Sequence, residues 1–190
     1  MKRTAKFIII ALLCITLCAC SSKTDLSKDA IAREYSACTE LGIRAAVTAD
    51  CGGSVFEYGM KYSGSAESGT ITVVSPESIA GIVIKTDSAS GVTKLVYDGV
   101  ELMAGELDKD GLTAVSAIPA MLDRWKNGYV SEAVTELLDG AKYTALTYPI
   151  SDETELTTWF DPDTLLPYRA EFSVSGRTVV FCSFQDVTIN

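Results

Sequence analysis

Apolar and polar residues alternate along most of this chain, which is the period of a β-strand with one buried face. The alternation starts at 43–49 and returns at 56–62, beyond Gly52-Gly53, a dipeptide typical of hairpin turns. Further strand-like segments lie at 70–76, 81–87, 93–99, 100–106, 142–150, 155–161, 167–175 and 177–189. Successive strands with no long helix between them favour antiparallel pairing.

Helical spacing, with apolar residues three and four positions apart, replaces this alternation in three places. The first helix is predicted from Asp29 to about Leu41, where Gly42 ends it. The second is predicted at 117–126 and the third at 131–138, with an N-cap serine before it and Gly140 after it. The second and third helices form an insert between the two groups of strands.

The order of these elements predicts an α+β fold. A long antiparallel sheet curls, so we expect a strongly curved half-barrel whose concave face is covered by the N-terminal helix and the two-helix insert. No linker, low-complexity segment or internal repeat divides residues 29–190, which are predicted to form a single domain.

The first residues have the pattern of a bacterial export signal. Lys2, Arg3 and Lys6 precede an apolar run from Phe7 to Leu17 that is too short to span a bilayer comfortably. The signal therefore predicts an exported protein, and residues 1–19 are predicted to be removed as a signal peptide.

The signal ends in Leu17-Cys18-Ala19-Cys20, which resembles the bacterial lipobox. In a lipobox, the cysteine receives diacylglycerol and becomes the mature N-terminus, and two or more acyl chains hold a protein stably on a membrane. Cys20 is thus the predicted lipidation site, at the outer face of the cell membrane, and residues 20–28 form a polar tether. The alternative is an ordinary signal peptide with incidental cysteines.

The predicted mature chain is strongly acidic. Without the signal it has 13 basic and 25 acidic residues, a net charge of −12. Such a chain is repelled by phosphate backbones, which argues against a nucleic-acid partner. Anionic headgroups repel it too, so the lipid anchor is the expected membrane attachment. No cofactor is expected beyond the covalent diacylglycerol on Cys20.

Besides the lipidated Cys20, three cysteines remain after processing: Cys38, Cys51 and Cys182. An exported location permits a disulfide, for which Cys38 and Cys51 are the pair closest in sequence. Free cysteines also serve as small buried hydrophobic residues, and the apolar strand around Cys182 is explained by packing alone. The odd number leaves one thiol unpaired in a monomer.

The chain contains no histidine, which excludes Ser-His-Asp and Cys-His catalytic arrangements and removes the commonest zinc ligand. Asp161 and Asp163 flank a proline, and Asp108 and Asp110 precede Gly111, but neither pair has the further ligands of a metal site. Turns favour Asp and Gly, so both pairs are interpreted as turns. No metal site and no catalytic residue are predicted.

The remaining candidate site is the inside of the curled sheet. Apolar side chains there form either a packed core or a groove for an acyl chain or an apolar partner segment, and both need the same residue types. The candidate groove residues are Phe56, Tyr58, Met60, Tyr62, Ala170, Phe172 and Val174.

Four stretches together resemble the LolA/LolB-like family of lipoprotein carriers: "VVSPESIAGIVI" (73–84), "LVYDGVEL" (95–102), "WFDPDTLLPYRAEF" (159–172) and "TVVFCSFQDVTIN" (178–190). Trp159, Asp161, Thr164 and Pro167 match that family's hairpin between late strands. The order of elements is similar from residue 29 to residue 190. Within that family the chain looks closest to lipid-anchored Gram-positive relatives such as the GerS-type germination lipoproteins.

The resemblance implies a curved half-barrel plugged by helices and a non-enzymatic role. Its expected ligands are an acyl chain, a lipoprotein, or an envelope protein such as a cell-wall amidase. The alternative function is that of an enzyme of the cell envelope, associated with peptidoglycan, or of an accessory to such an enzyme. It would need a cleft with converging polar groups, and no recognised catalytic spacing supports one.

The lipidation site can be tested by replacing its sulfur. We expect Cys20→Ser protein to leave the membrane fraction and to lack the mass of the lipid, because only the cysteine thiol accepts diacylglycerol. Fractionation and intact-mass measurement check both outcomes. Membrane partitioning without any change in mass would contradict the lipobox.

Overall fold

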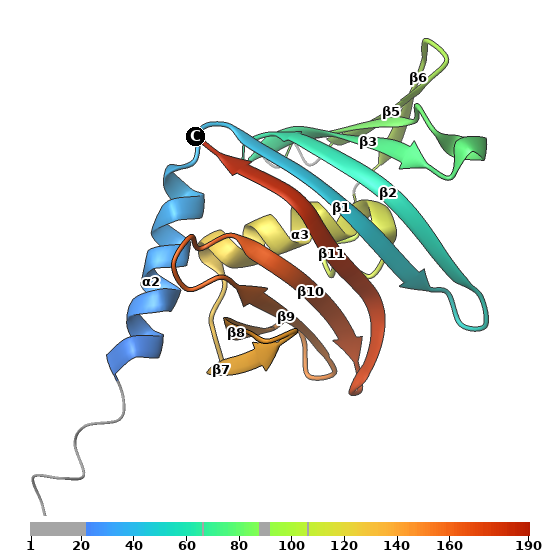
Figure 1. The fold of residues 1–190 in the computed structure, drawn as a ribbon. Helices are drawn as coiled ribbons and strands as arrows, with labels where there is room; N and C mark the ends of the chain where they lie inside the picture. The colour runs from blue at the N-terminus through green and yellow to red at the C-terminus, as the bar shows by residue number, and fades with distance from the viewer. Residues whose placement is uncertain (1–21, 66, 88–91, 106) are drawn as a thin grey trace, which may run out of the picture.

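The computed structural model describes residues 22–65, 67–87, 92–105 and 107–190 (Figure 1). The described helices are α2 (Ser22–Ala37) and α3 (Ala114–Asn127), with a short 3₁₀ turn, η1 (Glu77–Ile79). The described strands are β1 (Leu41–Asp50), β2 (Val55–Gly64), β3 (Ser68–Ser75), β4 (Val83–Asp87), β5 (Val92–Tyr97), β6 (Val100–Gly105), β7 (Glu132–Leu138), β8 (Ala141–Pro149), β9 (Thr154–Phe160), β10 (Pro167–Val174) and β11 (Arg177–Ile189).

These strands form one open antiparallel sheet in the order β6-β5-β4-β3-β2-β1-β11-β10-β9-β8-β7. The first and last strands of the described chain are neighbours at its centre, since β1 pairs with β11 on one side and with β2 on the other. The sheet curves around α3, and α2 runs along one end of it (Figure 1). The predicted α+β half-barrel is confirmed.

Alternation along β1 explains which face of the sheet is buried. Leu41, Ile43, Ala45, Val47 and Ala49 are all buried, while the residues between them are more exposed. Because a strand points successive side chains to opposite faces, these five define the concave face, and the cross-strand partners of each lie on the same face. The hydrophobic core is therefore on the concave side, under the helices.

The helix α3 is held at its start by a capping box. The side chain of Thr113 accepts a hydrogen bond from the Ser116 backbone, and the Ser116 side chain accepts one from Thr113. This reciprocal arrangement satisfies two amide groups that the first turn of a helix leaves free. The apolar side of the helix then faces the sheet with Ala117, Ile118, Met121, Leu122 and Trp125.

Trp125 joins both helices to the sheet. Its indole nitrogen donates to the Thr158 hydroxyl on β9 at 3.0 Å, and both side chains are buried. Its ring centroid lies 4.9 Å from that of Tyr35 on α2 and 5.4 Å from that of Phe160 on β9. Edge-on contacts of this kind add to the free energy gained from burying the rings.

The predicted second helix of the insert, 131–138, is wrong. Glu132–Leu138 is the edge strand β7, which pairs with β8 along its whole length. A helix of eight residues is marginally stable in isolation. The backbone groups of this segment instead form hydrogen bonds with β8 at the edge of the sheet. Asp139 and Gly140 both have positive φ (51° and 83°), so Gly140 belongs to a tight hairpin turn rather than to a helix end.

The first helix also has other limits than those predicted from Asp29 to Leu41, since α2 spans Ser22–Ala37. Its end is determined by the last strand: the backbone amides of Thr39 and Glu40 both donate to the Asn190 carbonyl, so Leu41 already starts β1. Within the described residues, no helix has both the length and the apolar character needed to cross a membrane.

Replacing Trp125 tests how far the core depends on it. We expect Trp125→Ala to lower the free energy of unfolding by about 3–5 kcal/mol, because it leaves a large cavity and the Thr158 hydroxyl loses its partner. Urea denaturation measures the loss. Tyr129→Ala is the control: Tyr129 is 72 % exposed, and its removal should cost less than about 0.5 kcal/mol. Equal losses in the two variants would refute the central role of Trp125.

Candidate functional site

The aspartates of the closing hairpin act in a turn. The Asp161 carboxylate accepts hydrogen bonds from the amides of Asp163 (3.0 Å) and Thr164 (2.8 Å) and from the Thr164 hydroxyl (3.0 Å). The bond from the Thr164 amide is the main cause of a lowered pKa of Asp161. Leu165 completes the turn with a positive φ of 59°. This carboxylate is engaged by the backbone around it.

Asp108 has the same kind of role. Its two carboxylate oxygens each accept a hydrogen bond at 3.0 Å, one from the Asp110 amide and one from the Leu112 amide. The described part of the chain contains no group of three or more acidic, cysteine or histidine side chains that could hold a metal ion. Both aspartate pairs thus lie in turns, as the sequence predicted.

The central residues of the predicted groove lie inside the core. Met60, Tyr62, Ala170 and Phe172 are at most 2 % exposed, in a cluster that includes Trp125 and the rest of the buried face of α3. Burial raises the pKa of Tyr62 to about 12, and its hydroxyl donates to the Ser65 carbonyl. In this conformation the middle of the concave face is filled by protein side chains.

The outer residues of the predicted groove are less covered. Tyr58 is half-buried against the core, and Val174 is half-buried beside a surface hollow that Asp50 and Leu112 also line. Phe56 is exposed at the far end of β2. The structure thus does not bring the seven candidate residues together around one open groove.

One cavity does open between α3 and the sheet. It measures about 330 Å³ and lies between the ends of β4 and β5, one side of α3, and the loop before that helix. Pro119 and Ala120 form its apolar wall on α3, and Arg124 and Asp123 add charge. Such a combination of apolar wall and few polar groups is typical of small-ligand sites.

Next to this cavity, the concave face continues onto the hairpin of β5 and β6 without a helix over it. Cross-strand pairing joins Ile84 on β4 to Leu95 on β5, and Leu95 to Leu102 on β6. Burial falls along this row: Ile84 is 2 % exposed, Leu95 is half-buried and Leu102 is 57 % exposed. The apolar lining of the core therefore extends into solvent at this edge.

We call Leu95, Tyr97, Val100 and Leu102 the hairpin face. Tyr97 pairs with Val100 next to the turn at Asp98-Gly99, so all four side chains lie on the concave side. Tyr97, Val100 and Leu102 are each about half exposed or more. Sequence reasoning placed this hairpin correctly but missed its exposed face. The signal was present in the apolar residues on both strands of this hairpin, Leu95 and Tyr97 on one strand and Val100 and Leu102 on the other.

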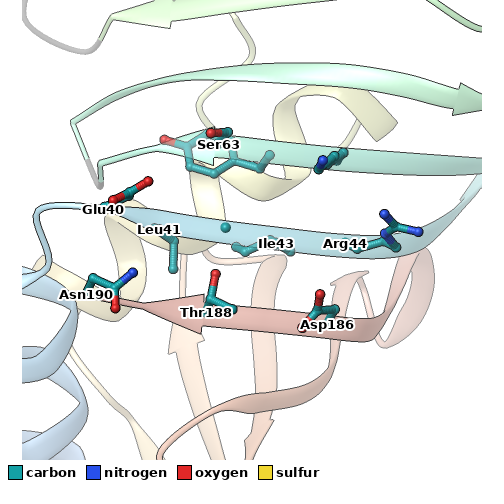
Figure 2. A pocket seen from close by; sticks show the side chains of 11 residues that line it. Glu40, Leu41, Ile43, Arg44, Ser63, Asp186, Thr188 and Asn190 are labelled. Carbon is teal, nitrogen blue, oxygen red and sulfur yellow. The ribbon is translucent and has the colours of Figure 1, made fainter.

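A second hollow lies on the convex side of the sheet, across β11, β1 and β2 (Figure 2). It measures about 280 Å³ and is centred on Gly42, which pairs with Thr188 on one side and Ser63 on the other. Its walls carry both signs of charge: Arg44 and Lys61 against Glu40 and Asp186. This polar surface differs in character from the apolar hairpin face.

The Cys38–Cys51 disulfide is not formed, and the described cysteines, Cys38, Cys51 and Cys182, are free. Cys38 precedes β1 and Cys51 follows it, so an extended strand of ten residues separates them, about 30 Å and far beyond disulfide reach. Cys182 is buried in β11, and that burial raises the pKa of its thiol to about 12. The predicted lipidation site, Cys20, lies outside the described residues.

No protein-family model matches the chain, and no curated protein matches its sequence. Solved structures match its fold. A LolA superfamily protein from Nitrosomonas europaea is 15 % identical, with a TM-score of 0.52, over 90 % of this chain and 94 % of that one. An uncharacterized conserved protein from Thermus thermophilus is 9 % identical, with a TM-score of 0.54, over 86 % and 88 %.

A third match is a putative outer membrane lipoprotein-sorting protein domain from Vibrio parahaemolyticus. It is 11 % identical, with a TM-score of 0.50, and the alignment covers 85 % of this chain and 91 % of that one. These likenesses extend over nearly the whole described chain at low identity. The chain therefore has the LolA-like fold, which confirms the predicted resemblance at the level of the fold.

The Asp161 turn predicts a dependence of stability on pH. A folded pKa below that of the unfolded chain means that the carboxylate stabilises the fold fully above about pH 4, and that this stabilisation is lost as the pH falls through the lowered value. We expect Asp161→Ala to lower the free energy of unfolding at pH 7 by about 1 kcal/mol, a typical cost of losing a capping side chain. The difference from the unmodified protein should shrink at pH 3 and below.

Urea denaturation of the two proteins at pH 7 and pH 3 measures this change. Asp163→Ala is the matched control, because the hydrogen bonds of the described turn go to the Asp161 carboxylate and not to that of Asp163. A constant difference between the Asp161→Ala protein and the unmodified protein at both pH values would show that ionisation of Asp161 does not contribute.

Proposed function

We propose that this protein is an exported lipoprotein, anchored through diacylglycerol on Cys20, that acts as a non-enzymatic module and binds an envelope protein at its hairpin face. The observation that carries the proposal is the uneven cover of the concave face. The helices α2 and α3 bury its centre, whereas Tyr97, Val100 and Leu102 remain exposed at one end. Exposed apolar patches of this kind are typical of interaction sites.

The proposed anchor favours a protein partner, rather than the bilayer, as the occupant of the hairpin face. The described chain starts at the outer end of α2, two residues after Cys20, and the β5–β6 hairpin projects from the opposite end of the molecule (Figure 1). A protein held by lipid near Ser22 therefore directs the hairpin away from the bilayer. The exposed apolar side chains then face the space in which envelope proteins lie.

The packed centre supports a protein partner over an acyl chain. A groove for an acyl chain needs apolar walls that are open to the ligand, but Met60, Tyr62 and Phe172 are already in contact with protein atoms. Opening that groove would require α3 to leave the sheet, with loss of the Trp125–Thr158 hydrogen bond and of the aromatic contacts. The non-enzymatic part of the proposal rests on the absence of histidine and on the engagement of Asp108 and Asp161 in turns.

The 330 Å³ cavity beside α3 favours a second candidate, a small hydrophobic ligand. Its volume falls at the lower end of the range for small-molecule sites, and Pro119 and Ala120 give it an apolar wall. Native mass spectrometry of the purified domain separates the two candidates. Lipid bound at one molecule per chain, and lost in Ala120→Phe protein, would favour this ligand over a protein partner.

A photoreactive residue at position 97 tests the protein partner. We expect the anchored protein, irradiated in its own membranes, to form one defined protein adduct from Tyr97 and none from Val74. The two positions are matched, since their side chains are 48 % and 50 % exposed, but Val74 lies on β3 outside the hairpin face. Mass spectrometry of the adducts reads the result. Equal adducts from both positions, or lipid adducts alone, would contradict the proposal.

A further inference from the structure

The strand β6 is an open edge of the sheet. It pairs with β5 on one side, and the described sheet has no strand on its other side. An edge strand has backbone amide and carbonyl groups that are free to pair with another chain. The same strand carries Val100 and Leu102 of the hairpin face, so unpaired backbone and exposed apolar side chains occur together.

Natural sheets protect such edges with charge, and the two edges of this sheet differ in that respect. The opposite edge, β7, carries the carboxylates of Glu132 and Glu136. On β6 the one charged side chain is Glu101, and Lys94 of the neighbouring strand neutralises it at 2.7 Å. The β6 edge therefore has no unneutralised charge to keep another strand away.

The charge of the whole chain selects among the occupants of this edge. The net charge is −9, and two copies of a strongly acidic protein repel each other as they approach. A basic partner is attracted by the same field. The described chain begins at the end of the molecule opposite the β5–β6 hairpin (Figure 1), so the proposed lipid on Cys20 favours a protein segment rather than the lipid surface as the occupant.

We propose that a basic envelope protein adds an extended strand to the β6 edge, with every second side chain, apolar in type, on the hairpin face. Backbone pairing with residues 100–105 would supply affinity, and contact with the exposed apolar side chains of Val100 and Leu102 would favour apolar side chains in the added strand. This inference rests on the proposed function and adds the mode of binding: the sheet of this protein continues into its partner.

Hydrogen exchange of the complex tests the mode of binding. The probe is the adduct captured by the photoreactive residue at position 97, compared with the free protein at single-residue resolution. Strand addition predicts that every second amide of residues 100–105 exchanges at least about tenfold more slowly in the adduct, because each such amide gains a backbone acceptor. The β7 edge, 132–138, is the internal control and should not change.

A charge at Met103 gives an independent readout. Met103 is 75 % exposed on the convex side of β6, away from the hairpin face. Strand addition brings a partner strand beside Met103, so Met103→Lys should lower the adduct yield about fivefold through repulsion of a basic strand. Docking on the concave side alone predicts no change. Val74→Lys, on β3, is the matched control and should leave the yield unaltered.

The outcomes separate this inference from the proposed function. Absence of any protein adduct from position 97 refutes both. An adduct in which the amides of β6 exchange as in the free protein, with Met103→Lys at full yield, overturns strand addition and leaves partner binding at the hairpin face in place. An adduct with twice the mass of this chain overturns the basic partner in favour of a second copy.

Discussion

The fold depends on one contact, the insertion of Trp125 between the helices and the concave face. A half-barrel exposes a wide apolar surface, and α3 covers its centre because the Trp125 indole bonds to Thr158 and packs on Phe160. The helix α2 is in turn held against α3 by Tyr35, whose ring contacts Trp125. The side chains first considered as a ligand groove are core residues because this contact holds both helices over them.

Much of this fold could be predicted from the sequence, because half-buried strands have a period of two and their turns carry Gly and Asp. The ten predicted strands are present, including the hairpin at Asp98-Gly99. The segment 131–138 could not be assigned correctly, since Val134, Leu137 and Leu138 suit a helical spacing as well as a strand. Pairing with β8, a tertiary interaction, decided between them. The limits of α2 likewise depended on a distant residue, Asn190.

The candidate site was harder to predict than the fold. Residue type identifies the apolar positions, and strand alternation assigns them to a face, but neither says how far a helix extends over that face. Met60 and Leu102 have equally apolar side chains on the same side of the sheet. They differ because α3 covers Met60 and does not reach Leu102. How far a helix extends over a sheet depends on three-dimensional packing. Exposure, rather than composition, distinguishes the hairpin face from the core.

The pairing of β1 with β11 also has a consequence for how the molecule is made. These strands are neighbours along nine residue pairs, yet more than a hundred residues separate them in sequence. Contacts of such long sequence separation form slowly, because the intervening chain must first be brought into a closed loop. The centre of the sheet therefore cannot be completed until the last strand has been synthesised. For the export proposed above, this order of strands keeps the sheet incomplete until the whole chain has been made.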